Sequence, residues 1–362
     1  MKRYSLLMTV WGALGVCVAA AAAQDAPDIR PSQDFRGHRE AVRQIAFHPD
    51  GKLLVSAGQE GCLRLWDLET GRLVRRILPR GRTVAEQVPA APIRRRIESV
   101  AFSPDGKLIA EVAVEPSGST ALRLWNPEDG EVVRMLAEGV DGMRALAFAP
   151  DGKLIAANMR EPLGWGQKIL LRDVQTGKVV AELRNKRVAA SLIEFSPDGK
   201  LLASAGATKI HIWDVAQRKL LHTIAAHEKA IQSIAFSPNG KLLLSGSTDD
   251  TVRVWKVETG KMDLEIEAEQ DGVLAVAFSP SGKVIASGGK DKTIKLWKPK
   301  SGKMYARLWG HLDKVYCLAF SPDGKTLASG SADTTVALWP IPEPENDEDE
   351  NEEDEEDEWE DD

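Results

Sequence analysis

Short runs of alternating apolar and polar residues, separated by turn sequences, make up most of the chain between residues 29 and 339. The run at 231–236, for example, is followed by Ser-Pro-Asn-Gly, whose Pro and Gly favour a tight reversal of the chain. Further runs at 242–246, 252–255 and 262–268 are each preceded by a polar turn. The pattern predicts four consecutive antiparallel strands, which we name a, b, c and d.

This four-strand unit is repeated. The sequence Phe-Ser-Pro-Asp-Gly-Lys, or a close variant, ends strand a seven times, with spacings of 55, 46, 47, 41, 42 and 42 residues. A period near 42 fits four short strands and their turns and is too long for a leucine-rich or ankyrin unit. The repeated phenylalanines are Phe47, Phe102, Phe148, Phe195, Phe236, Phe278 and Phe320.

The end of strand c carries a second signature, because six of the ten Trp residues occupy this one position. The dipeptides there are Trp66-Asp67, Trp125-Asn126, Arg172-Asp173, Trp213-Asp214, Trp255-Lys256, Trp297-Lys298 and Trp339-Pro340, and Gly-His precedes strand a at 37–38 and 310–311. The units resemble the repeats of the WD-repeat family of β-propellers. The resemblance implies an all-β fold, a seven-bladed WD-repeat β-propeller.

In this family a His, a strand b Ser or Thr, a turn Asp and the strand c Trp form a buried hydrogen-bonded network. The resemblance therefore implies a structural network rather than a catalytic triad. Its complete sets are His227, Ser245, Asp249, Trp255 and His311, Ser329, Asp333, Trp339. Its partial sets are His38, Ser56, Trp66, with Glu60 in place of Asp, and Ser287, Asp291, Trp297, with Glu269 at the His position. Units two and three depart further, at Glu111, Ala157 and Arg172.

The seventh unit lacks a strand d of its own, because Pro and acidic residues follow Trp339. By spacing, residues 31–37 stand where a strand d would precede the first unit. We therefore expect the N-terminal segment to supply the outer strand of the last blade and so to close the ring.

Departures from the repeat collect on one face of the predicted propeller. The first unit has 13 extra residues between strands d and a, and units two and three have longer b–c loops. In WD-repeat propellers both kinds of loop lie on one face, which we call the top face; the a–b and c–d turns form the bottom face. Because insertions in repeat proteins often mark the binding face, we predict a partner site over blades 1–3. The candidate contacts are Arg80, Arg82, Arg94, Arg95, Arg96, Arg160, Trp165 and Lys168.

The two ends of the chain have their own composition. Residues 1–23 read as a signal peptide, with Lys2 and Arg3 before an uncharged run that ends in five Ala residues. We expect cleavage near Ala23 and an exported protein of bacterial type, periplasmic or extracellular. An uncleaved N-terminal membrane anchor is the alternative, because about 20 uncharged residues can span a bilayer.

Charge is distributed unevenly. The 362 residues carry a net charge of −7, yet the segment from Pro340 to the end holds 16 Asp or Glu and no Lys or Arg, so the remainder carries about +9. We predict a propeller over residues 24–341 and an acidic, disordered tail over 342–362. The tail either folds back onto lysines of the bottom face or remains a solvated, solubilising brush.

The sequence contains no metal-ligand spacing, phosphate-binding loop or nucleophile elbow, so we predict no cofactor, no metal and no catalytic residue. The prediction is a monomeric, non-catalytic scaffold for protein–protein interaction with an acidic partner. Nucleic acid is not expected, because no stacking aromatic residues interleave with the Arg run. The alternative is a propeller hydrolase, similar to a lactonase, with ligands converging on the central channel.

Overall fold

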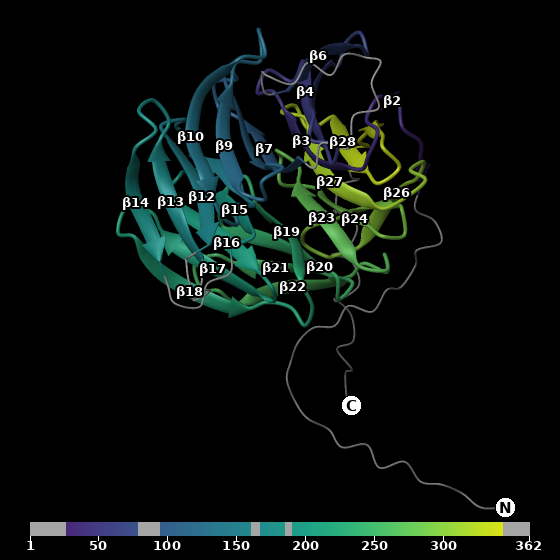
Figure 1. Ribbon diagram of the computed structural model, residues 1–362. Coiled ribbons are helices and arrows are strands. Elements are labelled where there is room, and N and C mark those ends of the chain that lie inside the picture. Colours follow the sequence, from purple (N-terminus) through teal and green to yellow (C-terminus); the bar gives the residue numbers. More distant parts are fainter. Residues whose placement is uncertain (1–26, 79–94, 161–166, 185–189, 343–362) are drawn as a thin grey trace, which may run out of the picture.

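The computed structural model describes residues 27–78, 95–160, 167–184 and 190–342, and all regular elements in these ranges are β-strands. The strands form seven twisted sheets arranged in a ring around one axis (Figure 1). The prediction of a seven-bladed all-β propeller is confirmed.

Blades 1 to 4 are four-stranded and antiparallel, and each follows the chain order a, b, c, d from the axis outward. Blade 1 contains β3 (Val42–Phe47), β4 (Leu53–Gly58), β5 (Leu63–Asp67) and β6 (Leu73–Ile77). Blade 2 contains β7 (Arg96–Phe102), β8 (Ile109–Val114), β9 (Thr120–Trp125) and β10 (Val132–Val140). Blade 3 contains β11 (Leu146–Phe148), β12 (Leu154–Arg160), β13 (Gln167–Asp173) and β14 (Val179–Arg184). Blade 4 contains β15 (Leu192–Phe195), β16 (Leu201–Gly206), β17 (Lys209–Asp214) and β18 (Lys219–Ala225).

The remaining blades complete the ring. Blade 5 contains β19 (Ile231–Phe236), β20 (Leu242–Ser247), β21 (Thr251–Lys256) and β22 (Met262–Glu267). Blade 6 contains β23 (Val273–Phe278), β24 (Ile285–Gly289), β25 (Ile294–Trp297), β26 (Met304–Leu308) and the added β1 (Asp28–Ile29). Blade 7 contains β27 (Val315–Phe320), β28 (Thr326–Ser331), β29 (Val336–Pro340) and β2 (Gln33–Phe35).

The repeated a–b turn shows why the Phe-Ser-Pro-Asp-Gly-Lys sequence recurs. In blade 2 the Ser103 hydroxyl donates to Asp105 Oδ1 (2.6 Å), which also accepts the backbone N–H of Lys107 (3.1 Å). Gly106 has a φ of +75°, a left-handed conformation that glycine adopts without a side-chain clash. The turn thus satisfies its own polar groups and reverses the chain at the bottom face.

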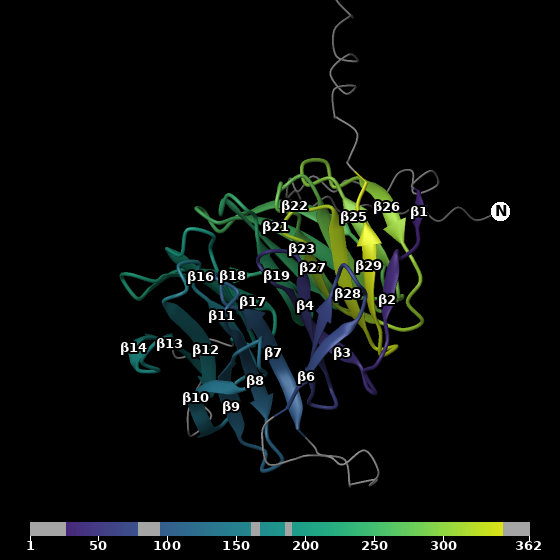
Figure 2. The same cartoon turned by 90° about the horizontal axis from the view of Figure 1, so that it is seen from above.

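The N-terminal segment closes the ring, as the repeat spacing predicts. β2 pairs antiparallel with β29, with Phe35 opposite Val336. The Phe35 ring stacks on Trp66 of blade 1, with ring centroids 5.2 Å apart. Figure 2 shows β2 beside β29 at the edge of the molecule. The observed strand is shorter than the predicted 31–37.

A second N-terminal strand was not predicted. β1 pairs with β26 of blade 6 in parallel, with Ile29 opposite Leu308. The backbone N–H groups of Arg307 and Trp309 donate to carbonyls of Pro27 and Ile29, both at 3.1 Å. The segment before blade 1 is therefore attached to two blades at the other end of the chain (Figure 2).

Apolar side chains fill the spaces between neighbouring sheets. One cluster of buried residues lies at each of the seven contacts between blades. At the contact between blades 7 and 1, Val42 and Trp66 pack with Val336 and Phe35. Since each sheet buries both faces against its neighbours, the ring is a continuous core around the axis. Cys62 and Cys317 are buried free thiols.

Candidate functional site

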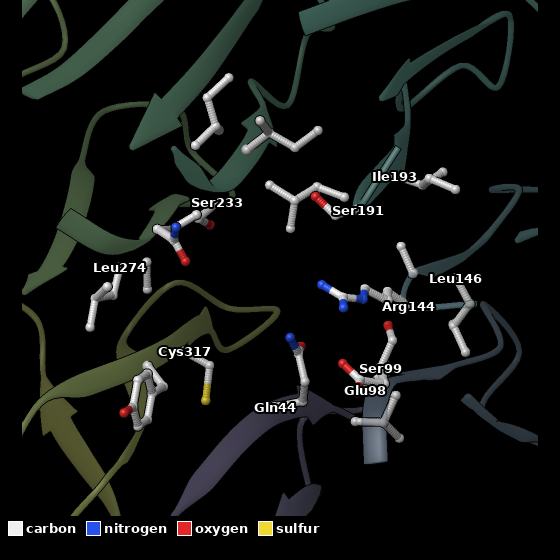
Figure 3. Close-up of a pocket in the computed structure, with 18 of the residues that line it drawn as sticks. Gln44, Glu98, Ser99, Arg144, Leu146, Ser191, Ile193, Ser233, Leu274 and Cys317 are labelled. Atoms are coloured by element: carbon white, nitrogen blue, oxygen red, sulfur yellow. The ribbon is translucent and has the colours of Figure 1, made fainter. Parts of the chain in front are cut away.

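The seven first strands surround a cavity of about 520 Å³ on the propeller axis (Figure 3). Position in the repeat determines what each strand contributes to it. The residue two positions before the repeated Phe is apolar in every blade. In six blades it lines the cavity, as Ile45, Val100, Leu146, Ile193, Ile234 and Leu318. Polar side chains, among them Gln44, Ser99 and Ser233, line the same cavity, so the channel interior is mixed in character.

The top mouth of the channel is polar. Residues four before the repeated Phe lie at the start of each strand a: Arg43, Glu98, Arg144, Ser191, Gln232, Leu274 and Tyr316. Six of them, all but Ser191, line a second, connected cavity of about 340 Å³, together with Gln59 and Arg96. Three guanidinium groups and one carboxylate thus surround this opening.

Two of these Arg side chains have partners within the protein. The guanidinium of Arg43 stacks over the Tyr316 ring, 3.7 Å from its centroid. With the Gln59 amide oriented so that its oxygen faces Arg43, that oxygen accepts two hydrogen bonds, of 3.0 and 3.1 Å. Arg96 Nε donates to Glu98 Oε1 (2.6 Å), so the carboxylate of the mouth is neutralised by its neighbour.

Arg144 is held differently, through its backbone. β11 is only three residues long, and the buried Asn158 replaces the missing strand pairing. Asn158 Oδ1 accepts the backbone N–H groups of Arg144 (2.8 Å) and Ala145 (2.9 Å), and its Nδ2 donates to Gly142 O (3.2 Å). The Arg144 side chain points into the open centre of the ring (Figure 3).

The predicted partner contacts of the top face have different environments. Arg80, Arg82, Arg94 and Trp165 lie outside the described residues. Arg96 is half exposed beside the channel mouth, Arg160 is exposed at the end of β12, and Lys168 Nζ pairs with Glu182 Oε1 at 3.2 Å.

Arg95 does not fit the prediction of a surface contact, because its side chain is only 4% exposed. It donates to Glu111 Oε2 and to Gly61 O, both at 2.6 Å. Glu115 and Arg123 complete a cluster of two positive and two negative groups, joined by an Arg123–Glu115 contact of 2.6 Å. Arg95 is therefore part of the core of blade 2.

The same cluster replaces the family network in blade 2. Trp125 Nε1 donates to Glu111 Oε2 (3.1 Å), the bond that Ser accepts in other blades. The substitution of Ser by Glu is compensated by Arg95, which balances the buried charge. Sequence reasoning had placed these two residues in different categories, one structural and one for binding.

The four-residue networks have the expected hydrogen bonds in blades 1, 5 and 7. In blade 5 the Nε2 atom of His227 lies 2.7 Å from Ser245 Oγ, its Nδ1 lies 2.9 Å from Asp249 Oδ2, and Trp255 Nε1 donates to Ser245 (2.8 Å). The equivalent bonds in blade 7 join His311 to Ser329 (2.6 Å) and Asp333 (2.9 Å), and Trp339 to Ser329 (2.7 Å). Blade 1 has them between His38, Ser56, Trp66 and Glu60, at 2.7–2.8 Å.

Protonation of these networks follows from burial. Burial lowers the pKa of His38 and of His227 more than their carboxylate partners raise it, which favours neutral rings. Burial alone would raise the pKa of Glu60, but hydrogen bonds from His38 and Arg64 lower it to about 2. A neutral His with its proton on Nδ1 donates to the carboxylate and accepts from Ser, which satisfies both ring nitrogens.

In blade 6 the prediction that Glu269 stands at the His position is wrong. Ser287 Oγ donates to Gln270 Oε1 (2.6 Å) and accepts from Trp297 Nε1 (2.8 Å). The fully buried Gln270, rather than Glu269, therefore takes the place of His, one residue later than the spacing predicts. Asp291 does not bond to the Gln270 side chain; its carboxylate accepts from Thr293 instead.

A recurring basic residue two positions before the strand c Trp was missed. Arg64 Nη2 and Arg253 Nη1 donate to the carbonyl that precedes the His, at 2.6 and 2.5 Å. In blade 6, Lys295 Nζ donates to Glu269 O, which precedes Gln270 (3.2 Å), and to Ala268 O (2.7 Å). These bonds tie strand c to the top end of strand a in three blades. The repeat alignment contains the signal, since the position is basic in five of seven units if His211 is counted.

Glu194 was also missed. It stands one residue before the repeated Phe, where the other six units have Ala. Its Oε1 accepts the backbone N–H of Phe236 in the next blade (3.1 Å). Burial raises the pKa of this carboxyl to about 8, although the hydrogen bond from Phe236 opposes the shift.

Two findings on other kinds of site concern the described ranges. No group of three or more His, Cys, Asp or Glu side chains there is placed to hold a metal ion. Nor does that part of the chain contain a helix of the length and apolarity needed to cross a membrane.

One known family matches the repeats seen in the structure. The WD40 family (WD domain, G-beta repeat) matches residues 29–67, 179–214, 218–256, 260–298 and 302–340, which together make up more than half of the chain. The chain belongs to the WD40 family. The matches leave out residues 68–178, the part that contains the altered WD40 networks of blades 2 and 3.

Similar proteins include WD40-type proteins from several eukaryotes. The WD repeat-containing protein SL1-17 of Schistosoma mansoni is 28% identical over 200 residues, which is 52% of this chain and 55% of that protein. Nuclear distribution protein nudF of Aspergillus niger is 27% identical over 196 residues, 54% of this chain and 40% of that protein. Periodic tryptophan protein 2 of Arabidopsis thaliana is 30% identical over 191 residues, which is 52% of this chain and 19% of that protein. The chain thus spans about half or less of the length of these relatives.

Proposed function

We propose that the protein is a non-catalytic interaction scaffold that binds a protein partner through the top face of blades 1–3. The observation that carries the proposal is the open polar cavity at the top mouth of the channel, lined by Arg43, Arg96 and Arg144. Membership of the WD40 family supports a binding role, and Arg160 extends the basic surface away from the axis. Charge complementarity with such a surface favours an acidic partner.

The alternative of a channel hydrolase has less support. Its ligands would have to converge at the starts of the first strands. The one carboxylate among the seven residues there, Glu98, is paired with Arg96.

A variant set tests the proposed face. Partner recovery with the full chain as bait is compared with recovery by the double variant R96A/R160A and by a control, K241A/K283A. The control removes the same charge from the a–b turns of the bottom face. We expect the first pair to lose the partner and the control to retain it, and equal recovery by both would refute the proposal. Arg95 is excluded from the set because its loss would disturb the core of blade 2.

We also propose that the protein is exported, that it is monomeric and that the acidic tail acts separately from the partner site. Export rests on the pattern of residues 1–23, which lie outside the described ranges, as does the tail. The relatives above are eukaryotic and do not support a bacterial type. N-terminal sequencing of the protein recovered outside the cytoplasm tests export, with Gln24 as the expected first residue.

A further inference from the structure

Arg144 differs from the other guanidinium groups at the top mouth of the channel. Its side chain is exposed and points toward the axis (Figure 3), and it makes no ion pair with a carboxylate of the described residues. Arg43 is occupied by Tyr316 and Gln59. Among the described residues, Arg144 is therefore the guanidinium at the opening that no carboxylate or aromatic ring of the protein holds.

The position of this charge is built into blade 3. Asn158, fully buried, accepts the backbone N–H groups of residues 144 and 145 and donates to Gly142 O. The backbone that carries Arg144 is therefore held by a side chain that no other blade has at this place. A long flexible side chain on a fixed backbone loses less freedom when it binds than one on a mobile loop.

The surroundings favour a carboxylate as the ligand. The opening of about 340 Å³ accommodates one or two side chains, and its walls hold three guanidinium groups and one carboxylate, so the local charge favours an anion. The planar guanidinium matches the two oxygens of a carboxylate and binds them in pairs. Glu98, which could repel such a ligand, is neutralised by Arg96.

We propose that the top mouth of the channel binds an Asp/Glu-rich segment of another protein molecule, with Arg144 as the principal contact and Asn158 as its positioning residue. This inference rests on the proposed function, because it names the chemistry of the partner that the top face takes. Arg43 adds a second positive charge on the far side of Glu98.

The protein's own tail begins on the opposite face. β29 is antiparallel to β28 and so runs in the same direction as β27, ending beside an a–b turn of the bottom face. There the Ile341 N–H donates to Lys325 O (2.9 Å). The described chain thus ends on the bottom face, whereas Arg144 lies on the top face, and the proposal commits to a segment presented by a separate molecule.

Fluorescence anisotropy on the full chain tests the proposal. The probe is a labelled synthetic peptide with the sequence of residues 345–362, and the control peptide replaces every Asp and Glu by Asn and Gln. The variants are R144A, R144K, N158A and, as a matched loss of one charge, K241A. Lys241 lies exposed in an a–b turn of the bottom face.

We expect R144A to weaken binding of the acidic peptide about tenfold, R144K to weaken it less, and K241A to change it less than about twofold. R144A should melt like the wild type, because its guanidinium makes no ion pair that folding depends on. N158A should lose affinity, and addition of R144A to it should cause little further loss, a non-additivity that mere destabilisation would not give.

Three results would overturn the inference. These are equal effects of R144A and K241A, equal binding of the neutral peptide, and peptide binding seen only after residues 343–362 are removed, which would mean that the tail occupies the site in the same molecule. If peptide binding fails while partner recovery still depends on Arg96 and Arg160, the proposed function stands and this inference alone is wrong.

Discussion

Replacement of Glu194 by Gln should remove a pH-dependent loss of stability. The side chain is largely buried between blades 4 and 5, where its Oε1 accepts the backbone N–H of Phe236. Gln keeps an oxygen in the same place for that hydrogen bond, but it does not ionise. The comparison of wild type and E194Q therefore isolates the effect of the buried charge.

The magnitude follows from the pKa. Burial raises the folded-state pKa of Glu194 from 4.5 to about 8. Because the folded form binds the proton more tightly than the unfolded chain, the stabilisation is complete below pH 4.5 and is lost as the pH rises to 8. At about 1.4 kcal/mol per pH unit the loss approaches roughly 5 kcal/mol, of which roughly 3 kcal/mol has occurred by pH 7.

Urea unfolding followed by Trp fluorescence at pH 5, 6, 7 and 8 measures the effect. The free energy of unfolding of E194Q relative to wild type should rise at each step and level off above pH 8. E69Q, which removes an exposed carboxyl from a c–d turn, should follow the wild-type curve. Parallel curves for wild type and E194Q between pH 5 and 8 would show that the folded state binds no extra proton there, and the reasoning would be refuted.

Three other changes test the architecture. R95A should cost about 3–5 kcal/mol in urea unfolding, because buried Glu111 would keep only the more distant Arg123, 3.9 Å away, as a positive neighbour; a cost below about 1 kcal/mol would mean that the Arg95–Glu111 pair is hydrated. S329A should cost about 2 kcal/mol by leaving the ring Nε2 of His311 unpaired, and an unchanged melting temperature would contradict that. Deletion of residues 29–37 should lower the melting temperature sharply, since it exposes the edges of two blades; a melt equal to wild type would show that the ring does not depend on the closure.

The fold was predictable because its determinants are local and repeated. Each unit carries its own turn sequence, strand alternation and strand c position, so all seven copies predict the same four-stranded sheet. The closure by β2 followed from the missing strand after Trp339. β1 was not predictable, because two residues paired in parallel with Arg307 and Leu308 leave no periodicity in the sequence.

The site was less predictable because it depends on residues that depart from the repeat. Arg95 and Arg96 are adjacent in the chain and look alike, yet one is buried on Glu111 and the other is half exposed. Only the pairing of β7 with β8 separates them. Gln270 replaces His one position late because residues 269 and 271 adopt positive φ, which shifts the register of the loop.

The closure of the ring also determines when folding can finish during synthesis. Ser32 donates to Leu338 O across 306 positions of the chain, and β2 has no place in its sheet until β29 has been made. Blades 1 to 5 contain only neighbouring segments and can form in the order of translation. The first strands to leave the ribosome must therefore wait for the last before the ring can close.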